Sequence, residues 1–272
     1  NDDRLLSEDI RGFRSGYFFG LIILLNKVIN FFSFKNEIIF TNKRPYIKIN
    51  GIYFQIVNKY FLKKVKEPYV SDANLIIDFL NKFKFKPKII LDVGACWGEF
   101  SLILGKHFND SRIYAIEGSE KNYRILHDNI EFKLNNIKNV ESFNFIVSDT
   151  ENYKFIRNII GTTNIVKNNI KIDDKDYSKV NTITLKKFLT ENKLIHIDFL
   201  KLDIEGHELN LIKDILDIDI KYGQIEIINL NSLEENLKFL EQLSTKYKFY
   251  DSENFNIIEE NKIKLYTSDK LE

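Results

Sequence analysis

The chain has 272 residues, of which 44% are apolar and 29% charged, and its formal net charge is +1. This composition is typical of a globular protein with one large core, and the balanced charge excludes the overall positive field that holds nucleic acid or an anionic membrane. The single cysteine, Cys96, excludes an internal disulfide framework and a multi-cysteine zinc site, so we expect a cytoplasmic protein.

Residues 1–36 contain an apolar run from Tyr17 to Leu25 that is about half of the roughly 20 residues needed to cross a bilayer, so no transmembrane segment is predicted. Asn26, Asn30 and Ser33 follow helical spacing and predict an amphipathic helix with a wide apolar face. We expect this face to pack on the main domain or to form a homodimer. Attachment to a membrane surface is the alternative.

Residues 37–66 change to the alternating pattern of strands. Asn50-Gly51 lies between the alternating runs 46–49 and 52–57, and this pair is a strong hairpin signal. The segment therefore predicts a small accessory antiparallel sheet.

Residues 67–272 alternate between helical and strand patterns and are predicted to form the main α/β domain. A helix after Asp72 ends before Pro87, and the apolar run Ile89–Val93 that follows is typical of a parallel strand buried on both faces. Next comes a turn to a helix around Phe100 to Leu104. Ligands of open α/β sheets bind at this end of such a strand.

The turn itself has the pattern Asp-x-Gly-x-x-x-Gly from Asp92 to Gly98. Cys96 stands where a dinucleotide fingerprint needs its middle glycine, which lets the backbone approach a pyrophosphate. A cationic nucleoside without phosphate, such as S-adenosylmethionine, therefore fits better. A glycine turn with no ligand is the alternative, because a single glycine motif is a weak signal.

The second strand, Arg112 to Ile116, also ends in a carboxylate, Glu117, about 20 residues after the glycine turn. In doubly wound folds an acid at this place accepts both ribose hydroxyl protons of an adenosine-containing ligand; an ordinary surface glutamate is the alternative. After a helix over 119–133, the third strand is predicted over 141–147. It ends at Ser148-Asp149, where an adenine edge would be read or where a turn begins.

Residues 150–180 predict an irregular excursion with edge strands. The fourth strand, Ile197 to Ile204, contains Lys201 and Asp203, which point to the same face because they are two residues apart. Burying both charges is costly unless they are paired. If this strand lies beside the one that ends at Asp92, Lys201 can bridge the two aspartates. A solvated Lys-x-Asp on an edge strand is the alternative.

The fifth strand is predicted over 224–228, with Glu226 embedded in it and directed toward the same strand ends. A helix from Leu233 to Leu243 follows, and segments 247–250 and 263–266 are predicted as a terminal strand pair.

In order along the chain, these motifs resemble those of the FkbM family of S-adenosylmethionine-dependent methyltransferases. The resemblance covers about residues 60 to 230, and its most specific part is the Lys-x-Asp-x-Glu-Gly-x-Glu block from Lys201 to Glu208. The segments that carry it are Glu67-Pro68, Asp92-Val93-Gly94-Ala95 with Gly98, Ile116-Glu117, Asn122-Tyr123, Leu126, Asn129, Thr182-Ile183-Thr184-Leu185, the Lys201 block and Glu226. Gly118 departs from the family, which usually has proline there.

The resemblance implies a class I methyltransferase fold. This is a Rossmann-like doubly wound sheet of order 3-2-1-4-5-7-6 with the last strand antiparallel, here with an N-terminal helix and a β-hairpin appendage. It also implies O-methyl transfer to a hydroxyl of a sugar or glycan-type small molecule, with residues 67–272 as the S-adenosylmethionine-binding methyltransferase domain and S-adenosylhomocysteine as the product. The predicted cofactor-binding residues are Asp92, Gly94, Ala95, Trp97, Gly98, Glu117, Gly118, Ser148, Asp149 and Asp203.

A sugar hydroxyl must lose its proton during or after attack, which requires a carboxylate or imidazole within reach. The catalytic candidates are Lys201, Asp203, Glu205 and His207; Asp203 is predicted to help place cofactor and acceptor, and Glu205 or His207 to accept the proton. Glu208 and Glu226 are candidates for substrate or metal binding. Clustered carboxylates suit Mg²⁺, but no metal is predicted.

Two other classes of protein stay open. A nicotinamide-dependent oxidoreductase shares the strand, turn and ribose acid, and Cys96 disfavours it. A non-catalytic binding module is disfavoured because such a protein has no need to bury charges in its fourth and fifth strands.

Overall fold

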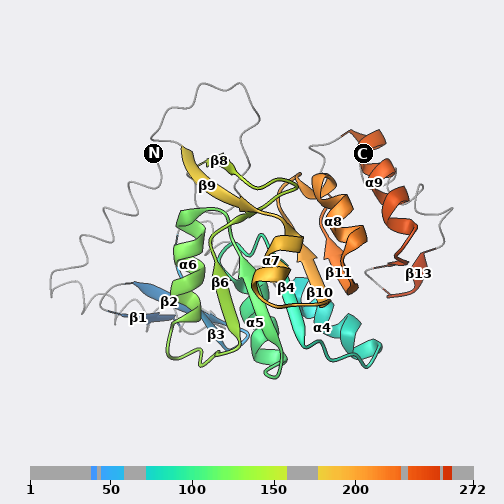
Figure 1. The fold of residues 1–272 in the computed structure, drawn as a ribbon. Helices are drawn as coiled ribbons and strands as arrows, with labels where there is room; N and C mark the ends of the chain where they lie inside the picture. The colour runs from blue at the N-terminus through green and yellow to red at the C-terminus, as the bar shows by residue number, and fades with distance from the viewer. Residues whose placement is uncertain are drawn as a thin grey trace. The chain divides into compact units, whose positions relative to one another are not determined.

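The computed structural model describes residues 38–41, 44–57, 72–157, 177–227, 232–251 and 254–258 (Figure 1). These residues belong to two compact units, one within 1–71 together with 131–136, the other within 72–130 and 137–272. The amphipathic helix predicted in residues 1–36 and the strand predicted at 263–266 lie outside the described residues. Within the described ranges, no helix has the length and apolar character needed to span a membrane.

The smaller unit contains the predicted hairpin. Strands β1 (Ile38–Phe40), β2 (Pro45–Ile49) and β3 (Ile52–Gln55) form an antiparallel sheet in that order. Asn50 and Gly51 connect β2 to β3 with φ angles of 51° and 77°, which is the backbone that a tight two-residue hairpin requires. Asn135 bonds both backbone groups of Tyr53 in this unit, with distances of 2.6 and 2.9 Å. The predicted hairpin at Asn50-Gly51 is therefore confirmed.

The larger unit is built on a sheet of five parallel strands in the order β11-β10-β4-β5-β6 (Figure 1). Counted along the chain, this order is 5-4-1-2-3, which confirms the predicted arrangement of the first five strands. The strands are β4 (Ile89–Val93), β5 (Arg112–Ile116), β6 (Val140–Phe143), β10 (Ile197–Leu202) and β11 (Ile220–Ile225). The helices are α4 (Asp72–Lys82), α5 (Glu99–His107), α6 (Glu120–Ile130), α7 (Leu185–Glu191), the 3₁₀ helix η1 (Glu208–Leu211), α8 (Ile212–Asp217) and α9 (Leu233–Ser244).

Helices cover both faces of this sheet. On one face, Phe100 of α5 stacks near Phe199 of β10, and Phe79 of α4 meets Tyr222 of β11 edge-on. On the other face, Phe188 of α7 meets Tyr114 of β5 edge-on, and both belong to a buried cluster that includes residues of α8 and α9. Apart from Asp92 and Lys201, the central strands are therefore covered by apolar side chains on both faces, as the apolar run Ile89–Val93 predicted.

The third strand is shorter than predicted, and the chain leaves the main sheet at Asn144. The strand β6 ends at Phe143, and Ile146–Val147 form a separate strand, β7, that pairs with β9 (Tyr177–Ile183). β9 also pairs with β8 (Tyr153–Arg157), and this small sheet is drawn above the main one in Figure 1. The Asn144 side chain donates to two carbonyls of the neighbouring turn, 2.8 and 3.1 Å away, which fixes the bend.

The fifth strand and the terminal strands also differ from prediction. β11 begins at Ile220 and ends at Ile225, so Glu226 follows the strand and is not embedded in it. β12 (Phe249–Tyr250) pairs with β13 (Ile257–Ile258) as a separate antiparallel pair. Among the described residues, the main sheet therefore ends at β11 and the expected 7-6 strands do not extend it.

Candidate functional site

Four residues form a row at the carboxyl ends of neighbouring strands. They are Glu117 after β5, Gly94 after β4, Asp203 after β10 and Glu226 after β11. The backbone ladder continues through the row, because Gly94 donates to Ile116 O at 2.9 Å, Asp203 to Val93 O at 3.0 Å and Glu226 to Leu202 O at 3.0 Å. Three carboxyl side chains and one glycine are thus brought to one edge of the sheet, the edge at which α/β proteins bind ligands.

A buried ion pair lies one step deeper in the same sheet. Asp92 and Lys201 are direct partners in the β4–β10 register, and the Lys201 Nζ lies 3.8 Å from Asp92 Oδ1 and 2.9 Å from Asp203 Oδ2. Asp92 is fully buried, and its Oδ2 accepts a hydrogen bond from Ser101 Oγ at 2.5 Å. Burial raises the pKa of the Asp92 carboxyl, while Lys201 and Ser101 act in the opposite direction. Lys201 therefore bridges the two aspartates, as predicted.

The glycine turn is close-packed against the end of β10. Gly94 has φ 84°, and a Cβ atom there would lie 1.7 Å from the Asp203 carbonyl oxygen. Ala95 donates to Ile116 O at 3.0 Å, and Gly98, with φ 83°, begins α5. A side chain at position 94 has neither the space nor the backbone conformation it needs.

Trp97 is held in the turn by α6. Its indole Nε1 donates to Asn122 Oδ1 at 3.1 Å, and its carbonyl accepts from Asn129 Nδ2 at 2.9 Å. Both asparagines are buried, so α6 fixes this part of the turn through polar groups withdrawn from water.

Glu117 is 5% exposed and binds the glycine turn directly. Its Oε2 accepts the Cys96 N–H at 2.9 Å, and its Oε1 accepts the Ser119 N–H at 2.7 Å. Burial raises the pKa of Glu117 to about 7, against the lowering effect of these hydrogen bonds. The Asn122 side chain also hydrogen-bonds this carboxylate, which has about four acceptor positions, so the carboxylate can still accept a further proton donor.

Gly118 lies where the third strand bends away. A Cβ atom at this position would lie 2.7 Å from Ile146 Cγ1 of β7. Glycine in place of the family's usual proline therefore leaves the space that β7 fills here. Asn144, which sequence reasoning missed, binds the Glu117 and Gly118 carbonyls, and its only sequence signal is an amide within an otherwise strand-like run.

Ser148 and Asp149 are not at the end of a main-sheet strand. Ser148 donates its N–H to Ile183 O of β9, and its Oγ donates to Asp149 Oδ1 at 3.0 Å. The predicted third strand over 141–147 is therefore too long, since it ends at Phe143, and the adenine contact of this pair stays a prediction.

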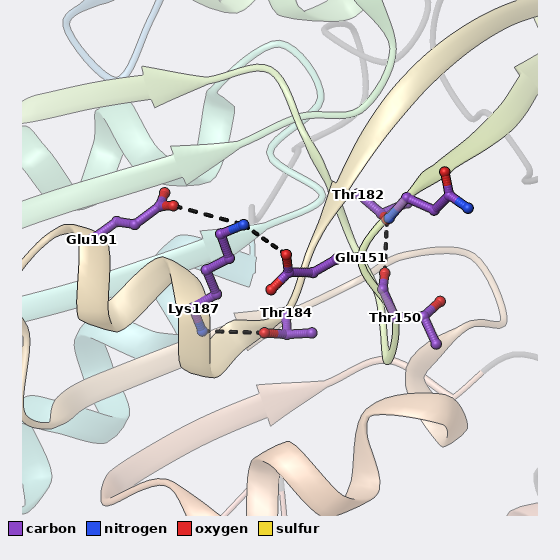
Figure 2. A network of polar contacts seen from close by, with 7 residues as sticks. Thr150, Glu151, Thr182, Thr184, Lys187 and Glu191 are labelled. Carbon is purple, nitrogen blue, oxygen red and sulfur yellow. Dashed lines mark hydrogen bonds and ion pairs between the residues drawn. The ribbon is translucent and has the colours of Figure 1, made fainter.

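The segment after Asp149 is tied to β9 and α7 by the network in Figure 2. Thr182 Oγ1 donates to Thr150 O at 2.7 Å, and Lys187 Nζ lies between Glu151 at 2.6 Å and Glu191 at 4.0 Å. Thr184 begins α7, where its Oγ1 accepts the Lys187 N–H. The ion pairs are exposed and contribute little, whereas Thr182 ties the segment to β9 through its hydroxyl and the backbone of β8 pairs with β9.

The fourth strand continues into a tight loop, Asp203 to Glu208. Glu205 and Gly206 have φ angles of 55° and 94°. Glu208 is buried, and its carboxylate accepts the N–H groups of Ile204 and Gly206, so it faces its own loop. The His207 Nδ1 lies 3.3 Å from Asn210 Nδ2.

Glu226 and Asp203 form a carboxyl pair. Glu226 is exposed, and its hydrogen bond with Asp203, together with partial burial and repulsion from Asp203 and Glu205, raises the pKa of Glu226 to about 7. The Glu226 carboxyl therefore gains and loses its proton near neutral pH. No three histidine, cysteine or acidic side chains of the described residues are placed to share a metal ion, so the Mg²⁺ option gains no support from geometry.

One family model and several solved structures are similar to this chain. A family model described as "Methyltransferase FkbM domain" matches residues 92–255. Similar solved structures include an FkbM methyltransferase from Methylobacillus flagellatus, with 15% identity, a TM-score of 0.31, and coverage of 47% of this chain and 28% of that one. A precorrin-6y C5,15-methyltransferase from Geobacter metallireducens has 14% identity, a TM-score of 0.40, and coverage of 65% and 74%. A SAM-dependent methyltransferase from Aquifex aeolicus has 17% identity, a TM-score of 0.37, and coverage of 71% and 90%. Comparison with curated proteins gives no match.

Proposed function

The chain belongs to the FkbM methyltransferase family of S-adenosylmethionine-dependent enzymes, and from this premise we propose that it methylates a hydroxyl group of a sugar or glycan-type molecule. The observation that carries the proposal is the row Glu117, Gly94, Asp203 and Glu226 at the carboxyl ends of four adjacent strands. The row combines a glycine turn with carboxyl groups, which suits a ligand with a positive charge and free hydroxyl groups.

The residues of the row fit S-adenosylmethionine. Glu117 is bound by Cys96, Ser119 and the Asn122 side chain, and its carboxylate can accept a further hydrogen bond from a ribose hydroxyl. Asp203, whose side chain is 27% exposed, supplies negative charge for the cationic end. Gly94 lets the turn pack directly against the Asp203 carbonyl oxygen, where a side chain would clash. When bound, the cofactor supplies a methyl group on a positively charged sulfur.

The Asp203–Glu226 pair is the proposed proton acceptor. A general base works best with a pKa near the working pH, and Glu226 has a pKa of about 7. Lys201 holds the Asp203 carboxylate at 2.9 Å, so the pair presents a fixed oxygen to an acceptor hydroxyl. His207 has its Nδ1 beside Asn210, and Glu205 lies in the adjoining loop, so both are second candidates.

Positioning is the main task of the remaining side chains. Alignment of nucleophile and methyl group converts a bimolecular step into an effectively unimolecular one. The buried Asp92–Lys201 pair fixes β4 against β10, and Trp97 and its asparagine partners fix the glycine turn against α6.

Calorimetry with S-adenosylhomocysteine tests the cofactor assignment. The wild type should bind it, and Glu117→Ala should weaken binding about tenfold or more, because ribose hydroxyls lose a charged acceptor. Glu191→Ala, which removes an exposed carboxylate of α7, is the matched control and should bind as the wild type does. Binding of a nicotinamide dinucleotide and not of S-adenosylhomocysteine overturns the assignment.

Transfer of a labelled methyl group tests the acceptor class. With labelled S-adenosylmethionine, methyl glycosides should gain an O-methyl group, and Glu226→Gln should slow the transfer. Labelling of amines, or of hydroxyls on aromatic rings alone, overturns the sugar assignment. The homodimer through residues 1–36 and the cytoplasmic location stay predictions from sequence.

A further inference from the structure

The Glu208 side chain has a geometry that its predicted contact with substrate or metal does not explain. The residue is 1% exposed at the start of η1. Its Oε1 accepts the Ile204 N–H at 2.7 Å, and its Oε2 accepts the Gly206 N–H at 2.9 Å. One carboxylate thus closes the loop that carries Asp203 and Glu205.

The loop backbone needs such a partner. Glu205 has φ 55°, a left-handed conformation that costs a residue with a side chain of order 1 kcal/mol or more, and Gly206 follows with φ 94°. Strained backbone of this kind persists only where surrounding contacts hold it. Hydrogen bonds to an ionised carboxylate are about twice as strong as neutral ones, and here two of them flank Glu205.

The loop position decides where Asp203 lies. The Asp203 carbonyl oxygen occupies the space that a side chain at Gly94 would need, and its carboxylate lies between Lys201 and Glu226. A shift of the loop therefore changes the wall of the glycine turn and the carboxyl pair together.

We infer that Glu208 is a positioning residue, which holds the Asp203–Gly206 loop as one wall of the cofactor site by binding the Ile204 and Gly206 amides. The inference rests on the proposed function and deepens it. Glu208 contacts neither substrate nor cofactor in this role and acts through Asp203.

Asp198 provides a matched control on β10, the strand that leads into this loop. Its Oδ2 accepts the N–H groups of Lys88 at 2.6 Å and Ile89 at 2.9 Å, near the amino-terminal end of β10. Glu208 and Asp198 thus make the same kind of double contact at opposite edges of the sheet. Asp198→Ala removes two hydrogen bonds, whereas Glu208→Gln keeps one acceptor oxygen and loses one.

The experiment compares Glu208→Gln with Asp198→Ala by calorimetry with S-adenosylhomocysteine and by amide hydrogen exchange. Glu208→Gln should raise the dissociation constant about tenfold and speed exchange at residues 204–206, because one charge-assisted bond is replaced by an amide facing an N–H. Asp198→Ala should speed exchange at residues 88 and 89 and leave the affinity unchanged. This should hold even if Asp198→Ala lowers the melting temperature more than Glu208→Gln does. Equal affinity of Glu208→Gln and wild type overturns the inference.

A second variant covers the case in which Glu208→Gln does not fold. Glu208→Asp keeps the charge but is one methylene shorter, so its carboxylate reaches one amide at a time. It should weaken S-adenosylhomocysteine binding less than Glu208→Gln does. If Glu208→Asp binds with wild-type affinity while the 204–206 amides exchange faster, the loop is not part of the cofactor site and the inference fails. If the wild type does not bind S-adenosylhomocysteine, the proposed function is wrong, and this outcome differs from the one that contradicts the role of Glu208.

Discussion

Lys201 and Asp203, two residues apart on the same face, are joined by a hydrogen bond of 2.9 Å between Nζ and Oδ2. The same ammonium group lies 3.8 Å from the fully buried Asp92. The Lys201 side chain therefore neutralises a carboxylate in the core and orients another at the edge of the proposed ligand site. The stability of the sheet and the geometry of the site depend on the same cation.

Replacement of Lys201 by methionine should lower the free energy of unfolding by about 3–5 kcal/mol, because it leaves Asp92 buried beside no positive charge. Urea unfolding followed by circular dichroism measures the loss. The double variant Lys201→Met with Asp92→Asn should lose less than the single Lys201 variant, since the amide is neutral and still accepts from Ser101. A double variant as unstable as the sum of both single changes contradicts the ion pair.

Gly94→Ala should abolish or strongly weaken S-adenosylhomocysteine binding. The added Cβ meets the Asp203 carbonyl oxygen at 1.7 Å and forces a left-handed backbone on alanine. Gly223→Ala is the control, since Gly223 lies outside the left-handed region and its nearest contact is Leu200 O at 3.1 Å. Calorimetry of both variants should show a large loss for Gly94→Ala and a small one for Gly223→Ala; the reverse order contradicts the packing of the turn.

The stability of the ligand-free protein should fall as the pH rises from about 4.5 to above 7. Glu117 has a pKa of about 7 in the fold against an ordinary value of 4.5, so the folded protein holds a proton that the unfolded chain releases. The stabilisation by this proton is complete below the ordinary pKa of 4.5 and is lost as the pH rises through 7. The free energy of unfolding should change by about 3 kcal/mol over this range. Chemical unfolding at several pH values measures this change, and Glu117→Gln should make the free energy of unfolding depend less on pH.

Binding of S-adenosylhomocysteine should have the opposite pH dependence. Ribose hydroxyls donate to the ionised carboxylate, so the affinity should rise between pH 6 and 8 as Glu117 loses its proton. Calorimetry in two buffers with different ionisation enthalpies should detect the released proton. An affinity independent of pH over this range excludes Glu117 as the ribose acceptor.

Asn144→Ala should weaken S-adenosylhomocysteine binding more than it lowers stability, because Asn144 holds the Glu117 and Gly118 carbonyls beside the proposed ribose site. Asn139→Ala is the matched control. Its amide donates to the carbonyls of Gly105, Phe108 and Ser111 at 3.0–3.1 Å, just before β6 begins. We expect about 1–3 kcal/mol of lost stability for Asn139→Ala with affinity retained. Equal effects of the two variants on affinity contradict the role of Asn144.

The strand ends and the lysine bridge were predictable because charges inside an apolar run have few stable solutions. Lys201 and Asp203 had to face a partner in a neighbouring strand, and Asp92 was the carboxylate at the end of the most apolar one. The order of the first five strands came from the doubly wound arrangement that the family resemblance implies, and the bridge from Lys201 to Asp92 was predicted on condition of that order.

The break after β6 was not predictable from local pattern. Residues 141–147 alternate well enough for one continuous strand, and the bend depends on a tertiary contact, the Asn144 amide on carbonyls of another turn. The role of Glu208 was hidden for a similar reason. Its carboxylate reaches back four residues only because Glu205 adopts a left-handed backbone, which no propensity favours for glutamate.

The row of strand ends has a consequence for how the protein is made. Glu117 and Gly94 come from the first half of the chain, whereas Asp203 and Glu226 come from the second, so a ribosome must release more than 200 residues before all four can meet. A nascent chain that has formed only β4, β5 and β6 possesses a glycine turn without its opposite wall. A nucleoside bound to this row as proposed would therefore stabilise only the completed sheet.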